Sequence, residues 1–238
     1  MYRYGYGYYR PDPTYLLVIL GVILCAIASA RVSATFKKYS RYRSMSCLTG
    51  AQAAERILHT AGIYDVTIRH ISGSLTDHYD PRNKTLNLSD SVYGSPSVAA
   101  VGVAAHECGH AIQHQKNYAP LTIRGAIVPV ANFGSKLAWP LILAGFIFSR
   151  STGSLLITLG ILCFSFAVIF QLVTLPVEFN ASSRALRILG DTGILNSEEL
   201  PMTRKVLKAA ALTYVAGALS GILQLLRLVL LFGGRRND

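Results

Sequence analysis

Charged residues are scarce in this chain of 238 residues: Asp, Glu, Lys and Arg make up 15% of it, against about 25% in an average soluble protein. Acidic residues are scarcer still, and none lies between Glu107 and Glu178. Since hydrophobic residues make up 51%, the composition excludes a disordered chain and argues against an ordinary soluble domain. The 4 cysteines include no pair with CxxC spacing, so neither a thiolate zinc site nor a disulfide framework is expected.

Four long apolar segments predict membrane-spanning helices, because about 20 apolar residues in a helix cross the hydrocarbon core of a bilayer. The predicted spans are residues 15–32, 125–148, 154–177 and 209–232. A secretory signal is the alternative for the first segment, but most of its basic residues follow the apolar run, which favours an uncleaved anchor. Tyrosines crowd residues 1–14, where an aromatic belt beside the first span is a simpler interpretation than a binding or aggregation motif.

Basic residues are unevenly distributed about these spans. Both termini and the turn at 149–153 share one side with 5 of the 23 Lys and Arg residues, whereas 16 lie on the opposite side, counting Arg31 at the end of the first span, and two lie within other spans. The positive-inside rule therefore predicts that residues 33–124 and 178–208 are cytoplasmic in a multi-pass protein of the cell membrane, although Arg235 and Arg236 argue weakly against this orientation. The net charge of +11 indicates contact with anionic headgroups of the lipid bilayer, and no nucleic-acid partner is expected.

The segment between the first two spans contains several short structured elements. Residues 49–62 begin with a capping threonine and end at a glycine, as a short helix does. Residues 65–71 and 85–89 alternate with the period of a strand, and 75–80 is a third candidate. These strands predict a small antiparallel sheet. A helix rich in alanine and valine is expected to follow at residues 97–115.

This last helix contains an HExxH motif at residues 106–110. His106 and His110 are four residues apart, so both imidazoles project from one helix face at a spacing that suits two ligands of one zinc ion. Glu107 lies beside the first ligand and could take a proton from the water on that zinc. A solvated helix face with incidental histidines is the alternative. It is disfavoured because the small apolar residues around the motif indicate burial, which is costly for polar groups without partners.

A catalytic zinc takes three protein ligands, so a third is expected from elsewhere in the chain. Glu178 is the best candidate, since it is the next acidic residue after Glu107 and follows the third span. The hairpin of the second and third spans returns it to the membrane face that carries the HExxH helix. An ordinary carboxylate in the first turn of a helix is the alternative. The fallback ligands are Asp191, Glu198 and Glu199, in a stretch with the composition of a solvated loop.

Three stretches of the sequence resemble one family of membrane enzymes. They are VAAHECGHA at 103–111, YDP at 79–81 and PVEFNAS at 176–182. With a similarity that extends over roughly residues 11–226, the chain resembles the YugP-type membrane zinc metallopeptidases and is more distantly similar to the HtpX-type and CAAX prenyl proteases. The resemblance implies a mainly α, integral membrane fold, with about four transmembrane helices. A zincin-like HExxH helix and a small antiparallel sheet lie together on one membrane face.

The resemblance also implies a cofactor and roles for individual residues. Zn²⁺ is the expected cofactor, with His106, His110 and Glu178 as its ligands and Glu107 as the general base. Residues 33–124 then form a cytoplasmic metallopeptidase region, and the segment 178–208 carries the third ligand.

The residues that support this site are left open by the sequence. In the distant relatives an aspartate four residues after the ligand glutamate orients a zinc histidine, but here that position is Ser182. Ser182 and Asn180 are both candidates for the orienting role. Arg184 and Tyr79 are candidates for stabilising the oxyanion of a tetrahedral intermediate, with the histidines of the predicted sheet as alternatives.

The expected function is that of an integral-membrane zinc metalloendopeptidase acting on membrane proteins or misfolded polypeptides at the membrane surface. The strand at 85–89 is a candidate edge for pairing with an extended substrate, and a purely structural hairpin is the alternative. A different class of function is a catalytically inactive membrane scaffold or assembly factor, whose structural zinc would be closed by a fourth ligand such as Cys108 or His114. The sequence allows a homo-oligomer without supporting one.

Overall fold

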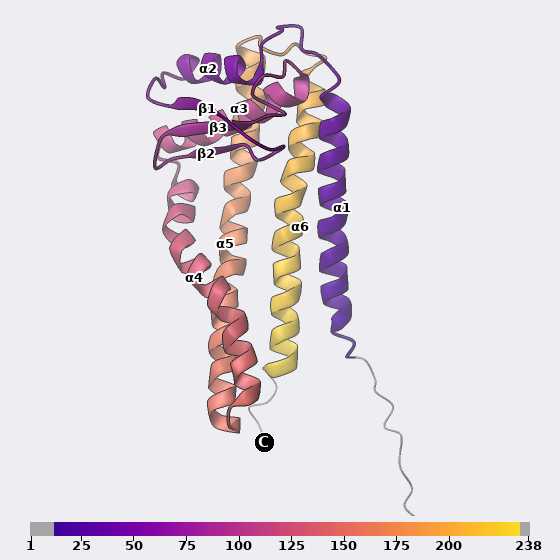
Figure 1. Ribbon diagram of the computed structural model, residues 1–238, viewed down its shortest axis with the longest axis vertical. Coiled ribbons are helices and arrows are strands. Elements are labelled where there is room, and N and C mark those ends of the chain that lie inside the picture. Colours follow the sequence, from indigo (N-terminus) through magenta and orange to yellow (C-terminus); the bar gives the residue numbers. More distant parts are fainter. Residues whose placement is uncertain (1–11, 234–238) are drawn as a thin grey trace, which may run out of the picture.

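The computed structural model describes residues 12–233, in which six helices and three strands follow one another (Figure 1). In chain order the elements are α1 (Tyr15–Tyr39), α2 (Gly50–Thr60), β1 (Thr67–Ile71), β2 (His78–Asp80), β3 (Thr85–Ser89), α3 (Val98–Gln115), α4 (Ala119–Ile147), α5 (Arg150–Asp191) and α6 (Leu200–Phe232). The tyrosine-rich segment predicted to form an aromatic belt lies almost wholly outside the described residues.

Four of the helices, α1, α4, α5 and α6, are long and apolar enough to cross a membrane. Large apolar side chains are exposed along them, such as Leu16, Phe133 and Ile147. No more than 22% of the most apolar window of any of these helices is buried within the protein. Exposed apolar surface of this extent is a liability in water, whereas the hydrocarbon of a bilayer solvates it. The chain is therefore the helical membrane protein that the sequence predicts.

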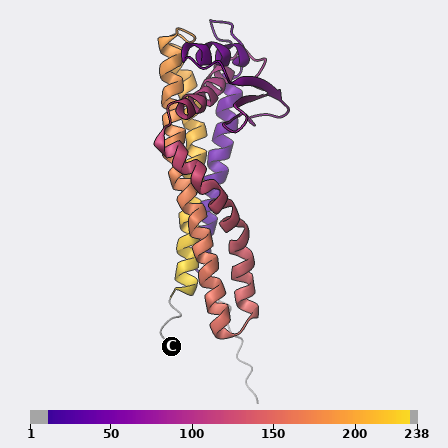
Figure 2. The same cartoon turned by 90° about the vertical axis from the view of Figure 1, so that its left-hand side faces the viewer.

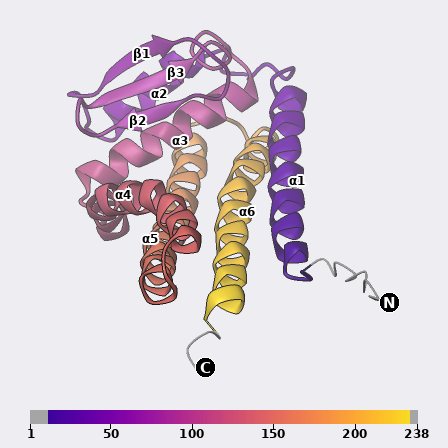
Figure 3. The same cartoon turned by 60° about the horizontal axis from the view of Figure 1, so that its bottom comes forward.

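The long helices form two antiparallel pairs, α4 with α5 and α1 with α6, and α5 packs against α6 (Figure 3). The start of α1, the end of α6 and the connection between α4 and α5 lie at one end of the bundle (Figure 1). At the other end lies a head, residues 40–118, which comprises α2, the sheet and α3. Everything predicted to face one side of the membrane is therefore gathered at one end.

The α4–α5 pair packs closely, and α4 changes direction along its length (Figure 2). A Cβ added to Gly134 of α4 would lie 2.7 Å from the carbonyl oxygen of Cys163 in α5. Small residues that allow such close approach are typical of helix contacts within membranes. Pro129 and Pro140 lie inside α4, and each removes a backbone donor, which explains the bend.

The sheet has the three expected strands, but the prediction that it is antiparallel is wrong. Its order is β1-β3-β2, and β3 pairs parallel with β1 and antiparallel with β2. The segment between β1 and β2 does not make a tight hairpin, because Asp77 accepts hydrogen bonds from the backbone and hydroxyl of Ser89 at the end of β3. This contact holds β2 at the far edge of β3. The β2–β3 hairpin then returns β3 beside β1 in the same direction.

The central position of β3 also corrects the expectation that residues 85–89 present an edge to a substrate. All five residues of β3 are buried, and both edges of the strand are paired. Leu86 and Leu88 are fully buried in the apolar core of the head. The alternation read in the sequence therefore marks the most covered strand of the sheet.

α3 lies at the centre of the head and contacts α2, α5 and α6. Its first turn is capped by Ser97, whose hydroxyl accepts a hydrogen bond from the Ala100 backbone N–H at 3.2 Å. The apolar residues of its first half are almost all buried, in the core that also contains Ile57 and Leu189. This burial fixes α3 across the ends of α5 and α6, where it presents its second half, with the HExxH motif, to α5.

α5 and α6 are longer than the apolar runs that predict them. α5 continues through Glu178 to Asp191 without a break. α6 begins at Leu200 rather than near residue 209, with proline at the start of its first turn. The buried Glu199 stabilises this start, since its carboxylate accepts hydrogen bonds from the backbone of Met45 at 2.7 Å and Asn196 at 2.9 Å.

Candidate metal centre

Two histidines of α3 and one glutamate of α5 converge on a single point. The Nε2 atoms of His106 and His110 lie 3.2 and 3.5 Å from the same oxygen, Oε2 of Glu178. One ligand atom of each residue lies within 4.8 Å of those of the other two. Glu178 is only 2% exposed. The i, i+4 spacing of the histidines produces this geometry, because it places both rings on the helix face that contacts α5.

The two helices that carry these residues approach each other very closely at Gly109. A Cβ at this position would lie 2.6 Å from the carbonyl oxygen of Ala181, closer than two such atoms can pack. Gly109 lies between the two histidines in sequence, and Ala181 lies one turn after Glu178. The absence of a side chain at Gly109 is therefore what brings the Glu178 carboxylate within reach of both imidazoles.

Gln113 fixes the ring of His110. Its side chain is fully buried, and its amide nitrogen donates hydrogen bonds to the Val177 carbonyl at 2.8 Å and to Asn180 Oδ1 at 3.0 Å. The amide oxygen of Gln113 therefore faces His110 Nδ1, at 3.0 Å, and accepts a hydrogen bond from the Nδ1–H. The Nε2 lone pair of His110 is then free for a metal, as in zinc sites where an outer partner fixes the histidine tautomer.

The second ring, that of His106, is held from α5. Ser182 Oγ lies 3.1 Å from His106 Nδ1, on the turn of α5 that follows Glu178. A hydroxyl can accept a hydrogen bond from the Nδ1–H there, which leaves Nε2 of His106 directed at Glu178. Asn180, the other candidate for this role, instead contacts Gln113 and so supports His110 indirectly.

The remaining oxygen of Glu178 is also held in place. Arg124 of α4 donates a hydrogen bond from Nη1 to Glu178 Oε1 at 3.3 Å. Because Oε1 is occupied in this way, Oε2 is the oxygen presented to the histidines. The carboxylate thus joins α4 to α5 as well as to α3.

These residues border a cavity of about 600 Å³ between the head and the bundle. Its walls come from β2 and the turn after it, from α3, from α4, and from single residues of α5 and α6. Glu107, His110 and Glu178 line it together. Glu107 is 8% exposed, so its carboxylate is largely shielded from solvent beside the three converging side chains.

The donor set fits a zinc ion. Two imidazole nitrogens and one carboxylate oxygen are ligands that zinc takes in catalytic sites, where a further position is left open. Burial by itself lowers the pKa of His110, but its hydrogen bond with Glu178 and the charge of Glu107 outweigh burial and raise the pKa overall. The negative surroundings that favour a proton on this histidine favour a metal cation equally.

The structure separates the two residues proposed as oxyanion stabilisers. Tyr79 of β2 lines the cavity, and its hydroxyl lies 2.9 Å from His114 Nδ1. Burial raises the pKa of Tyr79 to about 12, so the hydroxyl stays protonated at neutral pH. Arg184 instead donates to Asn180 Oδ1 at 2.6 Å and lies over the ring of Tyr118. It is therefore tied to the support of His110 and is not among the described residues that line the cavity.

The residues considered as fourth or substitute ligands lie elsewhere. The Cys108 thiol points to the opposite side of α3, where it contacts the Ala54 carbonyl of α2, and burial raises its pKa. Asp191 is 13 residues beyond Glu178 on the same helix, about 20 Å along its axis. Glu198 is exposed, and Glu199 is bonded to backbone near the start of α6. His114 lines the cavity but is hydrogen-bonded to Tyr79.

Three residues of the site were not predicted from the sequence: Gln113, Arg124 and Tyr214. Gln113 had a readable signal, because it is three residues after His110 and so shares its helix face. Arg124 precedes the second apolar run and belongs to no motif. Tyr214 lines the cavity from within the apolar run of α6, and only the tertiary packing of α6 beside α5 reveals its place.

The chain is similar in sequence to known proteins over nearly its whole length. The family model described as "Putative neutral zinc metallopeptidase" matches residues 14–233. The chain is also 48% identical over 223 residues to "Putative membrane protease YugP" of Bacillus subtilis (strain 168), covering 93% of this chain and 97% of that protein. No solved structure matches. Because the family match spans the head, the four long helices and all three converging side chains, the chain belongs to this family of zinc metallopeptidases.

Proposed function

We propose that the protein is an integral-membrane zinc metalloendopeptidase that hydrolyses peptide bonds at the membrane surface. The observation that carries the proposal is that Glu107 lines the same cavity as His110 and Glu178. A metal site with an adjacent carboxylate and space for a substrate is suited to hydrolysis, whereas a structural zinc site is closed by a fourth protein ligand.

The zinc ligands would be His106, His110 and Glu178. Zinc bound there supplies Lewis-acid polarisation of a carbonyl oxygen and makes a neighbouring water molecule more acidic. Glu107 takes the proton of the attacking water on its carboxylate and later donates it to the amine of the leaving peptide, so that the residue is regenerated. Gln113 and Ser182 hold the rings of His110 and His106 in fixed orientations during the reaction. Tyr79, protonated at neutral pH, can donate a hydrogen bond to the oxyanion that develops on the scissile carbonyl.

β2 is the strand best placed to bind an extended substrate. It lies at the edge of the sheet, paired with β3 on one side within the described residues, and His78 and Tyr79 line the cavity. An extended peptide can add to such an edge through backbone hydrogen bonds. The substrate would then run between β2 and α3, past Glu107.

The position of the cavity indicates the class of substrate. Residues 154–177 of α5 carry no charge and extend over about 36 Å of helix, slightly more than the hydrocarbon core of a bilayer. Glu178 follows directly, so the site lies where the bilayer ends. Membrane proteins, their juxtamembrane loops and misfolded polypeptides at the surface are the proposed substrates. The distribution of basic residues supports a site that faces the cytoplasm from the cell membrane.

The activity is tested on the full chain purified in detergent, with zinc content and casein cleavage measured on the same samples. Wild type is expected to hold about one zinc and to cleave casein. Glu107→Gln should keep the zinc and lose roughly 10²- to 10⁴-fold in rate. Glu55→Gln, an exposed glutamate of α2, is the matched control and should change neither quantity. Full activity in Glu107→Gln would overturn the proposal.

The orientation is tested separately with reporter fusions. A reporter inserted at Lys116, an exposed residue after α3, should be cytoplasmic, and one at the C-terminus should be external. The reverse result would place the site on the other membrane face without affecting the chemistry.

A further inference from the structure

We propose that an anionic phospholipid binds in a groove between α5 and α6, on the cytoplasmic side of the proposed membrane region. The groove has a volume of about 600 Å³ and is separate from the cavity that contains Glu107. Its α5 wall runs from Phe179 to Arg187, and its α6 wall runs from Leu200 to Val215. Its residues belong to neither the proposed chemistry nor the proposed substrate path, with the exception of Ser182, which lines the groove and also contacts the ring of His106.

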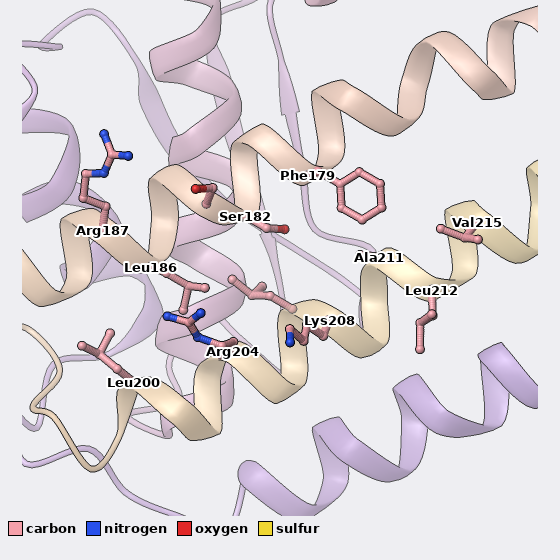
Figure 4. A pocket seen from close by; sticks show the side chains of 12 residues that line it. Phe179, Ser182, Leu186, Arg187, Leu200, Arg204, Lys208, Ala211, Leu212 and Val215 are labelled. Carbon is pink, nitrogen blue, oxygen red and sulfur yellow. The ribbon is translucent and has the colours of Figure 1, made fainter.

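The charge in the groove is grouped at one end. Arg187, Arg204 and Lys208 lie toward the head, whereas Phe179, Leu212 and Val215 lie toward the middle of the bundle (Figure 4). The antiparallel course of the two helices produces this division, because higher numbers on α5 and lower numbers on α6 both lie nearer the head. The groove therefore has a cationic end near the head and an apolar end toward the middle of the bundle.

The three basic side chains lack acidic partners. Arg187, Arg204 and Lys208 are exposed, and in residues 12–233 none of them forms an ion pair. Three uncompensated positive charges beside one groove attract an anionic ligand and repel a cationic one. A lipid phosphate has the complementary charge and accepts several hydrogen bonds, which arginine and lysine donate.

The polarity of the groove follows that of a bilayer. The uncharged part of α6 begins directly after Lys208 and continues to Leu226, so Arg204 and Lys208 lie on the headgroup side of its apolar part. Val215 is seven residues further along, about 10 Å deeper. Phe179 and Leu212 are 49% and 42% exposed, which leaves apolar surface for an acyl chain. Basic pockets between transmembrane helices on the cytoplasmic side are sites for anionic headgroups.

A free phosphate would use only half of this groove. It would contact the cationic end and leave the apolar end empty, whereas a phospholipid uses both ends at once. A zwitterionic lipid would fill the apolar end, but its own positive group would face the three basic side chains. An anionic phospholipid is the occupant that satisfies both ends.

The test is native mass spectrometry of the full chain in mild detergent, titrated with phosphatidylglycerol or with phosphatidylcholine of the same acyl chains. The first phosphatidylglycerol should bind at least about tenfold more tightly than phosphatidylcholine, given three basic residues that each favour an anionic lipid. The triple variant Arg187→Gln/Arg204→Gln/Lys208→Gln should lose about tenfold in affinity for phosphatidylglycerol. Equal binding of the two lipids by wild type would overturn the proposal.

Two further variants test whether the lipid binds in the groove rather than elsewhere on the protein. Lys37→Gln/Lys38→Gln/Arg41→Gln removes the same charge from the head end of α1 and should change affinity less than about twofold, because these residues lie outside the groove and salt screens their attraction to a lipid bound there. Leu212→Trp keeps all three cations and fills the apolar end, so it should weaken phosphatidylglycerol binding as well. An equal loss in both triple variants, or full binding in Leu212→Trp, would contradict a lipid site in the groove. Melting temperatures in detergent establish that each variant is folded.

Discussion

Two hollows border α5: the cavity that contains Glu107 and the groove toward α6. Their volumes are similar, but their polar side chains differ in burial and in hydrogen bonding. In the cavity with Glu107, the side chains at the metal group are buried, or partly buried in the case of His106, and each is hydrogen-bonded: His110 to Gln113, His106 to Ser182, and Glu178 to Arg124. In the groove toward α6, three basic side chains stand exposed without acidic partners. Adjacent residues of one helix, Glu178 and Phe179, face these two environments.

This difference indicates how each hollow would work. A catalytic site benefits from side chains that are fixed before the substrate arrives, because small displacements of reacting groups are costly. A lipid site at a membrane surface needs only charge and an apolar channel, since the bilayer itself supplies the ligand at high local concentration. Substitutions on the cavity side of α5 should therefore have large effects on metal binding, and those on the groove side should have small ones.

The largest effect on zinc is expected from Glu178→Ala. Loss of outer partners of zinc ligands lowers metal affinity by roughly 10- to 100-fold, so loss of a ligand should exceed about 100-fold and abolish casein cleavage. The measurement is a competitive zinc titration against a chelator. Phe179→Ala, at the neighbouring position on the groove side, is the control and should retain the affinity of wild type. Full zinc binding by Glu178→Ala would show that the third ligand lies elsewhere.

A smaller loss is expected when the imidazole rings are released. Gln113→Ala and Ser182→Ala should each lower zinc affinity by roughly 10- to 100-fold. Gln113→Ala should have the larger effect, because the fully buried amide also bonds to Val177 and Asn180. Gln115→Ala changes the same residue type on the exposed part of α3 and should leave zinc binding intact. The ring-holding role is wrong if Gln113→Ala binds zinc as tightly as Gln115→Ala.

Gly109→Ala should act on the approach of the two helices rather than on any ligand. The added methyl group must displace the Ala181 backbone, and overpacking of this kind costs about 1–3 kcal/mol. At about 2–4 °C per kcal/mol for a chain of this size, the melting temperature in detergent should fall by several degrees. Gly217→Ala in α6, where a Cβ meets open space, is the matched control. An unchanged melting temperature in Gly109→Ala would mean that the helices separate without cost.

The smallest effect on zinc is expected from the groove. Arg187→Gln/Arg204→Gln/Lys208→Gln should change zinc affinity by less than about twofold, because these exposed charges are screened by salt. The same titration against a chelator measures it. A loss comparable to that of Gln113→Ala would mean that the two hollows are coupled through α5, and the contrast between them would fail.

The site could be predicted from the sequence where local spacing determines it. The four-residue separation of His106 and His110, and the return of Glu178 by a hairpin of spans, are properties of helices and of apolar runs. Arg124 could not be found in this way, since its contact with Glu178 depends on how α4 leaves the head. The end of an apolar run marks the position of Glu178 in the sequence, whereas nothing in the sequence indicates its contact with Arg124.

The fold, like the site, was predictable only in the parts that local sequence patterns determine. Apolar runs identify the four long helices, but the start of α6 is hidden because Arg204, Lys205 and Lys208 alternate there with the buried Thr203, Val206 and Leu207. The sheet was misread because strand direction depends on which strands pair. Alternation in β1 and β3 carries no information on their being parallel neighbours, which the long-range contact of Asp77 with Ser89 helps to determine.

The most direct test of the metal centre is X-ray absorption spectroscopy at the zinc edge of the full chain loaded with one zinc. The account predicts two imidazole nitrogens and one carboxylate oxygen, all at about 2.0–2.2 Å, with no sulfur at about 2.3 Å. Glu107→Gln should give the same spectrum, since Glu107 is not a ligand. A sulfur shell, or a third imidazole in place of the carboxylate, would contradict the assignment of His106, His110 and Glu178.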